Sequence, residues 1–143
     1  MIDRTPFNIL LADDDTDDCQ LFEKALKGIP IPNRLKIFGN GEELMNYLLK
    51  NSTDLPDVLF LDLSMPQKTG FECLIEIKEN KKLKNIPVFV FTTSIPSNIA
   101  AELELSNMLI NFGALDYIRK PADFEKLELS IHQAIIKVIE KVA

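Results

Sequence analysis

Cysteine, histidine and tryptophan are scarce in this sequence of 143 residues, which contains two cysteines, one histidine and no tryptophan. Two cysteines and one histidine cannot assemble a structural zinc site, so small zinc-stabilised folds are excluded. Cys19 and Cys73 lie inside two predicted helices, where a small buried apolar residue is the commonest role of a free cysteine. We therefore expect two buried thiols that form neither a disulfide nor a metal site.

Long hydrophobic runs and an excess of positive charge are also missing. The longest apolar stretch, residues 86–91, contains Pro87 and is far too short to span a bilayer. Residues 1–6 show no basic-then-apolar signal pattern. With 16 basic and 22 acidic residues, the formal net charge is −6, which does not suit direct binding to DNA or RNA. We expect a cytoplasmic protein with no nucleic-acid partner and no membrane partner.

Short β-rich apolar runs alternate along the chain with longer segments of helical apolar spacing. This alternation is typical of βα units, and right-handed crossovers between parallel strands place helices on both faces of the sheet. We predict one α/β domain over residues 1–143, with a five-stranded parallel sheet and helices on both faces. The expected strands are Phe7 to Ala12, Arg34 to Phe38, Val58 to Asp62, Pro87 to Thr92 and Asp116 to Arg119.

Capping residues and helix breakers delimit five predicted helices. The expected spans are Thr16, as the cap, to about Lys27; Asn40-Gly41 onward; about Phe71 to Glu79; Ser97 or Asn98, as the cap, to near Gly113; and Asp123, as the cap, to the C-terminus.

Polar residues stand at the points where four of the apolar runs stop. Residues 13–15 are all aspartate, Asp62 and Thr92 end two later runs, and Lys120 follows the last strand closely. In an open parallel sheet the carboxyl ends of neighbouring strands share one crevice, so these groups are expected to meet in a single site.

Several carboxylates gathered in one crevice repel one another unless a cation lies among them. Oxygen ligands without nearby histidine or cysteine favour Mg²⁺, or alternatively Mn²⁺, over zinc. An octahedral Mg²⁺ held by a few carboxylates keeps open positions for water or phosphate oxygens. A carboxylate can itself attack phosphorus, while Lys120 and the Thr92 hydroxyl can contact phosphoryl oxygens. The sequence therefore predicts phosphoryl chemistry at this edge of the sheet.

Four segments at successive strand ends together resemble the receiver domain of two-component response regulators. The resemblance covers essentially the whole chain in the right order and implies a flavodoxin-like (βα)5 receiver fold. The segments are Ile9-Leu10-Leu11-Ala12-Asp13-Asp14-Asp15, Leu61-Asp62-Leu63-Ser64-Met65-Pro66 with Gly70, Val90-Phe91-Thr92-Thr93-Ser94, and Tyr117-Ile118-Arg119-Lys120-Pro121.

The resemblance implies that Asp62 accepts a phosphoryl group from the phosphohistidine of a sensor histidine kinase or a histidine phosphotransfer protein. Asp13 and Asp14 match the metal-binding acidic pair, with Asp14 as the more direct ligand, and Ser64 would add its backbone carbonyl. Asp15 occupies a variable position, and we interpret it as an acid at the start of a helix.

The resemblance also assigns the residues that read the phosphorylated state. Thr92 matches the switch hydroxyl, Lys120 the phosphate-contacting lysine, and Tyr117 the aromatic side chain whose rotamer reports activation. The peptide bond between the family's lysine and the following proline is typically cis. Ser64 and Ser94 match the two positions that tune autodephosphorylation, and small polar groups there imply no unusual protection of the acyl phosphate.

This sequence departs from the family pattern at three places. Lys68-Thr69 precedes Gly70 where an acidic residue is common, which predicts a different choice of partners. Thr93 is bulkier than the residue that usually follows the switch hydroxyl. The segment from Thr92 to Lys120 is several residues longer than usual, so the fourth helix or its flanking loops are expected to be remodelled.

Two other functions compete with that of a phosphorylation switch. The first is a Mg²⁺-dependent phosphatase or phosphotransferase that forms an aspartyl-phosphate, but Ser64 stands where such enzymes commonly place a second acid. The second is a flavodoxin-like cofactor binder, in which residues 13–15 would repel the cofactor phosphate. We prefer the switch, a phosphoacceptor and not an enzyme, whose output passes by protein contact to an unknown downstream protein.

The last predicted helix carries a wider apolar face than one core contact needs. Its inward stripe is widened by three further apolar residues, Leu129, Ile136 and Ile139. A broad core contact and a surface for a homodimer or a downstream partner are both open. His132, on the same helix, has no evident partner, and we assign it no catalytic role. The stripe comprises Phe124, Leu127, Ile131, Ile135, Val138 and Val142.

Overall fold

The computed structural model describes residues 6–93 and 97–142, in which five strands alternate with five helices. The predicted α/β class is confirmed, and the observed ends lie within about two residues of those predicted. The elements are β1 (Phe7–Ala12), α1 (Thr16–Lys27), β2 (Asn33–Phe38), α2 (Gly41–Lys50), β3 (Val58–Leu61), α3 (Gly70–Glu79), β4 (Val88–Thr92), α4 (Ile99–Asn111), β5 (Asp116–Arg119) and α5 (Phe124–Val142).

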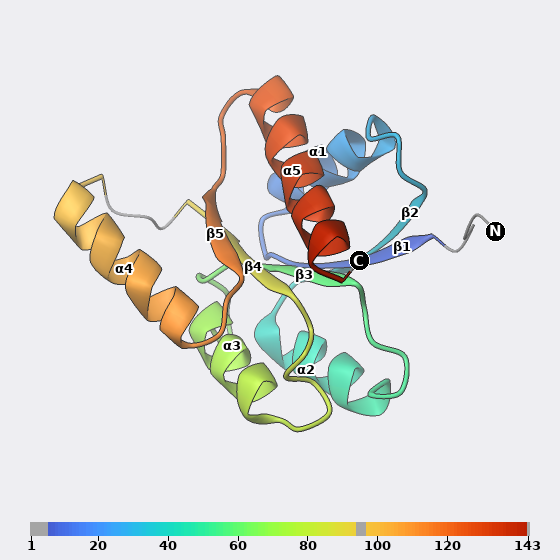
Figure 1. Cartoon of the computed structure of the whole chain (residues 1–143), viewed down its shortest axis with the longest axis vertical. Helices are drawn as coiled ribbons and strands as arrows, with labels where there is room; N and C mark the ends of the chain where they lie inside the picture. The colour runs from blue at the N-terminus through green and yellow to red at the C-terminus, as the bar shows by residue number, and fades with distance from the viewer. Residues whose placement is uncertain (1–5, 94–96, 143) are drawn as a thin grey trace.

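The five strands form one parallel sheet in the order β2-β1-β3-β4-β5. Helices α1 and α5 cover one face and α2 and α3 cover the other, as Figure 1 shows. Helix α4 stands beside β5 at the edge of the sheet (Figure 1). Because all strands run the same way, the loops that follow them gather at one edge, which we call the carboxyl edge.

The alternation of side chains along the strands divides the core into two layers. Along β1, Leu10 and Ala12 belong to the layer under α2 and α3, whereas Ile9 and Leu11 belong to the layer under α1 and α5. In the second layer the fully buried Phe22 ring of α1 makes edge contacts with Phe60 and Phe91 of the sheet. These contacts fix α1 relative to β3 and β4 and so position the loop that carries the first aspartates.

Polar caps begin the helices at the carboxyl edge. Asp15 is the N-cap of α1 and accepts a hydrogen bond from the Asp18 amide, so the prediction that Thr16 caps this helix was wrong by one residue. Helix α3 begins one residue earlier than predicted, because Thr69 and Glu72 form a reciprocal capping box. Asn40, Asn98 and Asp123 cap α2, α4 and α5, in agreement with the sequence.

Among the five described helices, α4 contributes the fewest buried residues to the core. Only Leu109 is buried within it. The helix is attached through the edge contact between Phe71 and Phe112 and through the hydrogen bond of Tyr117 to Glu102. Apolar side chains that remain exposed on or just after it are Ile99, Leu103, Met108, Ile110 and Phe112.

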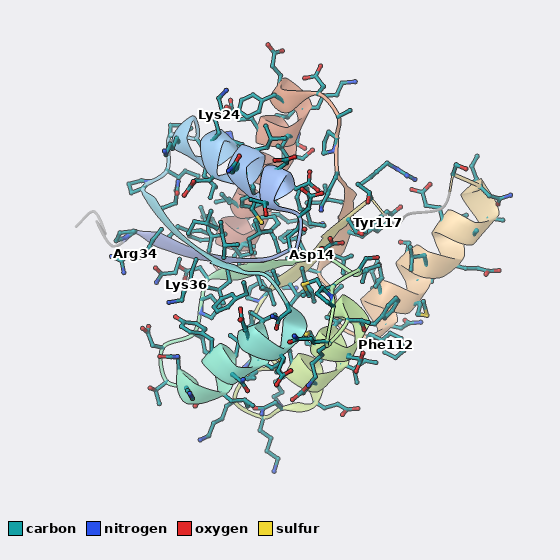
Figure 2. All side chains as sticks on the ribbon, turned by 180° about the vertical axis from the view of Figure 1, so that it is seen from behind. Asp14, Lys24, Arg34, Lys36, Phe112 and Tyr117 are labelled. Carbon is teal, nitrogen blue, oxygen red and sulfur yellow. The ribbon has the colours of Figure 1, made fainter. Side chains whose placement is uncertain are left out.

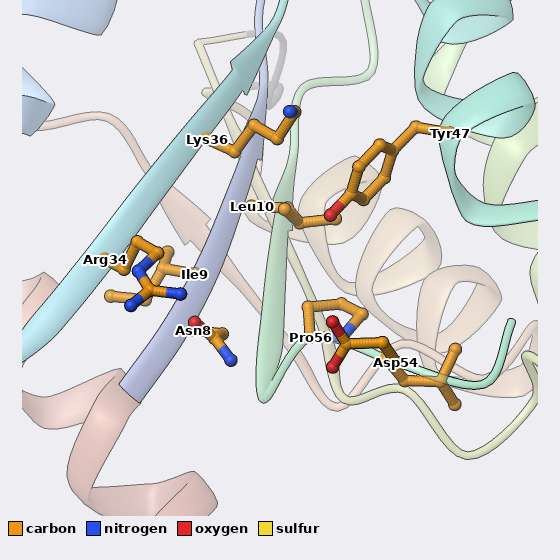
Figure 3. A pocket seen from close by; sticks show the side chains of 9 residues that line it. Asn8, Ile9, Leu10, Arg34, Lys36, Tyr47, Asp54 and Pro56 are labelled. Carbon is orange, nitrogen blue, oxygen red and sulfur yellow. The ribbon is translucent and has the colours of Figure 1, made fainter. Parts of the chain in front are cut away.

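Other features of the described residues agree with the composition. Cys19 and Cys73 are free and buried, as predicted. Among residues 6–93 and 97–142, no helix combines the length and apolar character needed to cross a bilayer. A hollow of about 190 Å³ lies beside the first residues of β1, where the Lys36 ammonium sits 4.9 Å from the centre of the Tyr47 ring (Figure 3). It is remote from the carboxyl edge, where the candidate site lies.

Candidate functional site

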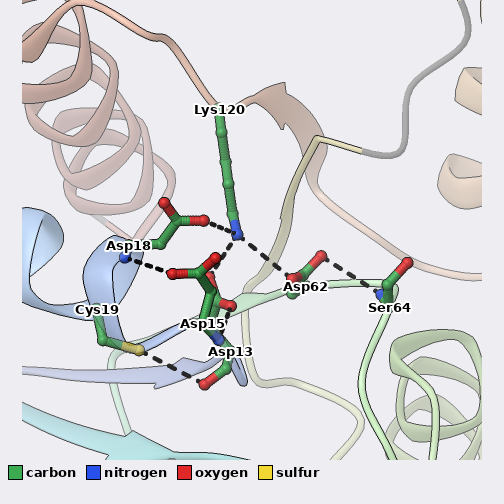
Figure 4. Close-up of polar contacts among 7 residues, drawn as sticks. All are labelled: Asp13, Asp15, Asp18, Cys19, Asp62, Ser64 and Lys120. Atoms are coloured by element: carbon green, nitrogen blue, oxygen red, sulfur yellow. Dashed lines mark hydrogen bonds and ion pairs between the residues drawn. The ribbon is translucent and has the colours of Figure 1, made fainter.

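The four strand ends that the sequence singles out meet at the carboxyl edge. Asp13 directly follows β1, Asp62 directly follows β3, Thr92 ends β4 and Lys120 directly follows β5. Backbone hydrogen bonds join neighbouring strand ends: the Asp62 amide donates to the carbonyl of Ala12, the residue before Asp13, at 3.0 Å, and the Lys120 amide donates to the Thr92 carbonyl at 3.0 Å. Residues 107 positions apart in the sequence are thereby brought into contact, as Figure 4 shows for Asp13 and Lys120.

The Lys120 ammonium is the centre of the site. Its Nζ donates to Asp13 Oδ2 at 2.5 Å, to Asp18 Oδ2 at 2.8 Å and to Asp62 Oδ2 at 3.3 Å (Figure 4). The Lys120 side chain is only 8% exposed and the Asp13 side chain only 1% exposed. Because an ammonium has three N–H donors, these three carboxylates can satisfy all of them.

Burial and charge act in opposite senses on this cluster. Burial raises the pKa of Asp13 to about 6, although the hydrogen bond and charge of Lys120 oppose the rise. Burial alone would lower the pKa of Lys120, but its bonds to Asp13 and Asp18 outweigh that effect and hold its pKa above the ordinary value. A buried carboxylate of this kind is stabilised by additional positive charge.

Three of the carboxylates can share a divalent cation. One oxygen from each of Asp13, Asp14 and Asp62 lies within 4.8 Å of the others. Asp14 is exposed, so this group of three acids is open to solvent on one side, whereas Asp13 and Asp62 are buried. An all-oxygen, anionic set of this geometry fits a hard divalent cation.

The loop after β3 is shaped by Gly70, where α3 begins. A Cβ atom at position 70 would lie 2.0 Å from the Asp62 carbonyl oxygen, so only glycine allows this approach. The Gly70 amide donates to the Leu63 carbonyl at 3.1 Å, and the exposed Ser64 donates its amide to Asp62 Oδ1 at 3.4 Å. The part of Ser64 as a carbonyl ligand stays a prediction.

The two residues predicted to read the phosphorylated state occupy different environments. Thr92 is fully buried at the end of β4, beside the lysine. Tyr117 is partly buried on β5 and donates its hydroxyl to Glu102 Oε1 of α4 at 2.9 Å. Arg119 lies 3.6 Å from the other oxygen of Glu102, so two β5 side chains share one α4 acid. Figure 2 shows Tyr117 on the side of the molecule toward α4.

Two sequence predictions at the site need correction or comment. The Lys120–Pro121 peptide bond is trans, as are all the peptide bonds in the described part of the chain, so the cis bond that the resemblance implies is not found. The trans isomer is the lower-energy form of such a bond. Ser94 lies outside the described residues.

Two further acids, Asp15 and Asp18, lie at the start of α1 beside the site. Asp15 is exposed and serves as the N-cap of α1, in agreement with its interpretation as a helix-start acid. The sequence analysis missed Asp18, which bonds directly to Lys120. A signal was present, because Asp18 lies three residues after the N-cap and therefore on the first turn of a helix that starts at the acidic loop. His132 is partly exposed, as predicted.

Comparisons with known proteins agree with this geometry. A family model described as the response regulator receiver domain matches residues 9–132. Response regulator Rcp1 of Synechocystis sp. is 40% identical over 93 residues, which cover 62% of this chain and 63% of Rcp1. The probable methanogenesis regulatory protein FilR2 of Methanothrix harundinacea is 30% identical over 131 residues, which cover 90% of this chain and 81% of FilR2.

Solved structures extend the likeness to three dimensions. The Mn(2+)-bound form of response regulator Rcp1 superimposes with a TM-score of 0.71 at 32% identity, covering 90% of this chain and 91% of Rcp1. The phosphorylated cyanobacterial phytochrome response regulator RcpA gives a TM-score of 0.76 at 30% identity, with the same coverage of 90% and 91%. Because the family model matches most of the chain, the chain belongs to the response regulator receiver domain family, whose members are phosphorylation-activated switches of two-component signalling.

Proposed function

We propose that this chain is a phosphorylation switch in which Asp62 accepts a phosphoryl group from the phosphohistidine of a sensor histidine kinase or a histidine phosphotransfer protein. The observation that carries the proposal is the place of Asp62: it is buried, it faces Lys120 Nζ at 3.3 Å, and it shares a possible cation site with Asp13 and Asp14. Asp13 shares these three properties, and Asp62 is chosen as the acceptor because it stands in the segment after β3 that matches the acceptor position of the receiver family.

The transfer is a substitution at phosphorus. A carboxylate oxygen of Asp62 forms a bond to phosphorus as the bond from phosphorus to the histidine nitrogen breaks. The nitrogen keeps the electron pair and takes up a proton, and Asp62 becomes an acyl phosphate. The Lys120 ammonium balances negative charge on the phosphoryl oxygens, and the Thr92 hydroxyl can donate to one of them.

We assign Mg²⁺ as the cofactor, with Mn²⁺ able to replace it. Asp13, Asp14, Asp62 and the Ser64 carbonyl would hold the cation. When bound, it supplies positive charge that offsets the repulsion between the acids and the incoming phosphoryl group. The oxygen-only donor set supports a hard cation, and the Mn(2+)-bound structure of Rcp1 supports a divalent one.

The signal is proposed to leave through the surface of α4, β5 and α5. Thr92 would move toward the acyl phosphate and Tyr117 would turn inward, which requires Tyr117 to give up its bond to Glu102. The output would then be a change in protein contacts, with no catalytic activity beyond phosphotransfer to Asp62 and hydrolysis of its own acyl phosphate. The cytoplasm stays our prediction for its location.

A second copy of the chain is one proposed partner for α5. Leu129, Ile136 and Ile139 are exposed there, at 55%, 39% and 39% of their full accessible surface. If these residues form a homodimer contact, Ile136→Glu should lower the mass measured by light scattering, whereas Gln133→Glu on the same helix should not. A monomer in the parent protein would instead leave the exposed strip to a downstream partner.

Phosphorylation by acetyl phosphate, a small acyl phosphate, tests the proposed function. We expect Mg²⁺-dependent labelling of up to one phosphoryl group per chain, with transfer to Asp62 and release of acetate. Labelling should be lost in Asp62→Asn and retained in Asp54→Asn, which removes an exposed acid from a loop at the other edge of the sheet. Labelling of Asp62→Asn at the parent level would overturn the assignment, and many turnovers of a separate phosphoester would favour a phosphatase.

A further inference from the structure

Lys120 has one carboxylate partner that lies outside the possible cation site. Asp18 Oδ2 accepts from Lys120 Nζ at 2.8 Å, a shorter bond than the 3.3 Å to Asp62. Asp18 is not among the three acids whose oxygens could share a cation. We propose that Asp18 is a positioning residue that holds the Lys120 ammonium beside Asp62 and thereby raises the rate at which Asp62 is phosphorylated. This inference rests on the phosphoacceptor role proposed for Asp62.

The first turn of α1 fixes Asp18 in place. Its amide donates to the Oδ1 oxygen of the N-cap Asp15 at 3.0 Å. One turn further along, the fully buried Phe22 ring lies 5.5 Å from the Phe91 ring, centre to centre. The Lys120 ammonium lies 5.7 Å from the centre of that same Phe91 ring. The helix that carries Asp18 and the Lys120 ammonium therefore both contact the buried Phe91 side chain of β4, which limits how far they can move apart.

The three partners of Lys120 cannot all serve it at every stage. If Asp13 and Asp62 held a cation, their oxygens would be shared with it, and Lys120 would be repelled by its charge. Asp18 is the acceptor that remains, and a hydrogen bond between charged groups is stronger than one between neutral groups. The Asp18 side chain is 33% exposed against 1% for Asp13, so keeping its charge costs less desolvation. Asp18 can thus retain Lys120 at the site throughout the reaction.

The sign of the effect separates positioning from simple charge. A negative charge near the site repels the anionic phosphodonor. If Asp18 acted only through this repulsion, its removal should accelerate labelling. Removing a positioning residue should slow labelling, because Lys120 is then less often beside Asp62. We expect Asp18→Asn to label about fivefold more slowly with acetyl phosphate and Mg²⁺, the fold-change that corresponds to loss of one partly exposed charge-assisted bond.

Asp17→Asn is the matched control. Asp17 is an exposed acid on the same helical turn, and its replacement changes the net charge and the helix dipole by the same amount. It should label at the parent rate or slightly faster. Asp18→Glu should recover the rate to within about twofold, because glutamate restores the charge and can reach the ammonium. In a Lys120→Met background, Asp18→Asn should cause no further slowing.

A measurement without phosphodonor or metal tests the contact itself. The Lys120 ammonium, assigned in ¹H–¹⁵N spectra by its disappearance in Lys120→Met, should lose protection from solvent exchange in Asp18→Asn and keep it in Asp17→Asn. Unchanged protection in Asp18→Asn, labelling at or above the parent rate, or equal slowing in the Lys120→Met background would each overturn the positioning role. All three results leave the proposed function standing, because that function is tested separately, by the loss of labelling in Asp62→Asn and by the turnover of a separate phosphoester.

Discussion

Helix α1 buries Cys19, Phe22, Ala25 and Leu26, whereas α4 buries Leu109 alone among its residues. Both helices begin at the carboxyl edge of the sheet, next to the candidate site. Helix α1 contributes the turn that carries Asp18, and its ring contacts tie that turn to the sheet. Helix α4 is linked to the site through β5, the strand before Lys120, because Glu102 of α4 contacts Tyr117 and Arg119 of that strand. The proposed reacting groups thus lie next to the helix with many buried contacts, and the helix proposed to change its contacts has few.

Truncation of one aromatic ring on each side should reveal the largest difference. Phe22→Ala is expected to lower the free energy of unfolding by about 3–5 kcal/mol, because a fully buried ring is replaced by a cavity. Phe112→Ala, at the end of α4, should cost about 1 kcal/mol, since the ring is 40% exposed and has one aromatic neighbour. Urea denaturation followed by circular dichroism measures both, and similar losses for the two variants would contradict the comparison.

Divalent cations should stabilise the α1 side. Binding to the native state alone at about 100 times the dissociation constant adds about 2.7 kcal/mol, so saturating Mg²⁺ should raise the melting temperature by several degrees. Asp14→Asn should remove most of this rise, because Asp14 is one of the three acids that could share the cation and is exposed enough to be replaced without a folding defect. Asp17→Asn provides the control of equal charge. An equal rise in Asp14→Asn and the parent would remove Asp14 from the metal site.

The attachment of α4 should depend on one acid. Glu102→Gln is expected to cost at most about 1 kcal/mol of stability, because its partners are partly exposed. It should nevertheless increase amide hydrogen exchange in α4 and leave exchange in α1 unchanged. The hydrogen bond to Glu102 raises the pKa of Tyr117, so the replacement should also move the phenol titration to lower pH. Glu104→Gln, on the exposed part of the helix, should do neither. Unchanged exchange in α4 would show that other contacts hold it.

The same contrast explains what the sequence could predict. The strands, the capped helices and the meeting of Asp13, Asp62, Thr92 and Lys120 follow from apolar periodicity and from the geometry of a parallel sheet. These signals are strong because they depend on the main chain and on burial. Two helix starts were predicted one residue off, at Asp15 and at Gly70. They depend on which of several adjacent polar residues provides the side chain that accepts the capping hydrogen bond, and the pattern alone does not decide that.

Side-chain partners across the fold were harder to predict. The bond of Asp18 to Lys120 joins two residues 102 positions apart, and the first turn of α1 also contains Asp17, which has the same charge and points elsewhere on the helix. Likewise, no pattern in the sequence indicates the hydrogen bond between Tyr117 and Glu102. Apolar residues of α4, such as Leu103, were expected along a helix, but their exposure depends on where α4 stands relative to β5. Such facts depend on tertiary placement, which local periodicity does not specify.

Thiol labelling should give the smallest effect and the finest comparison. Burial raises the pKa of Cys19 and Cys73 to about 11 each, so both are protonated at pH 8 and their thiolates form only as the pH rises above the ordinary value of 9.0 toward 11. Iodoacetamide at pH 8 should therefore modify Cys19 of the native protein only as fast as α1 opens. A thiol introduced by Leu109→Cys reports the opening of α4 in the same molecule. We expect it to react faster, because fewer contacts must break to expose it. If position 109 reacts no faster than Cys19, then α4 is held as firmly as α1, and the exposed apolar residues of α4 are features of a rigid surface.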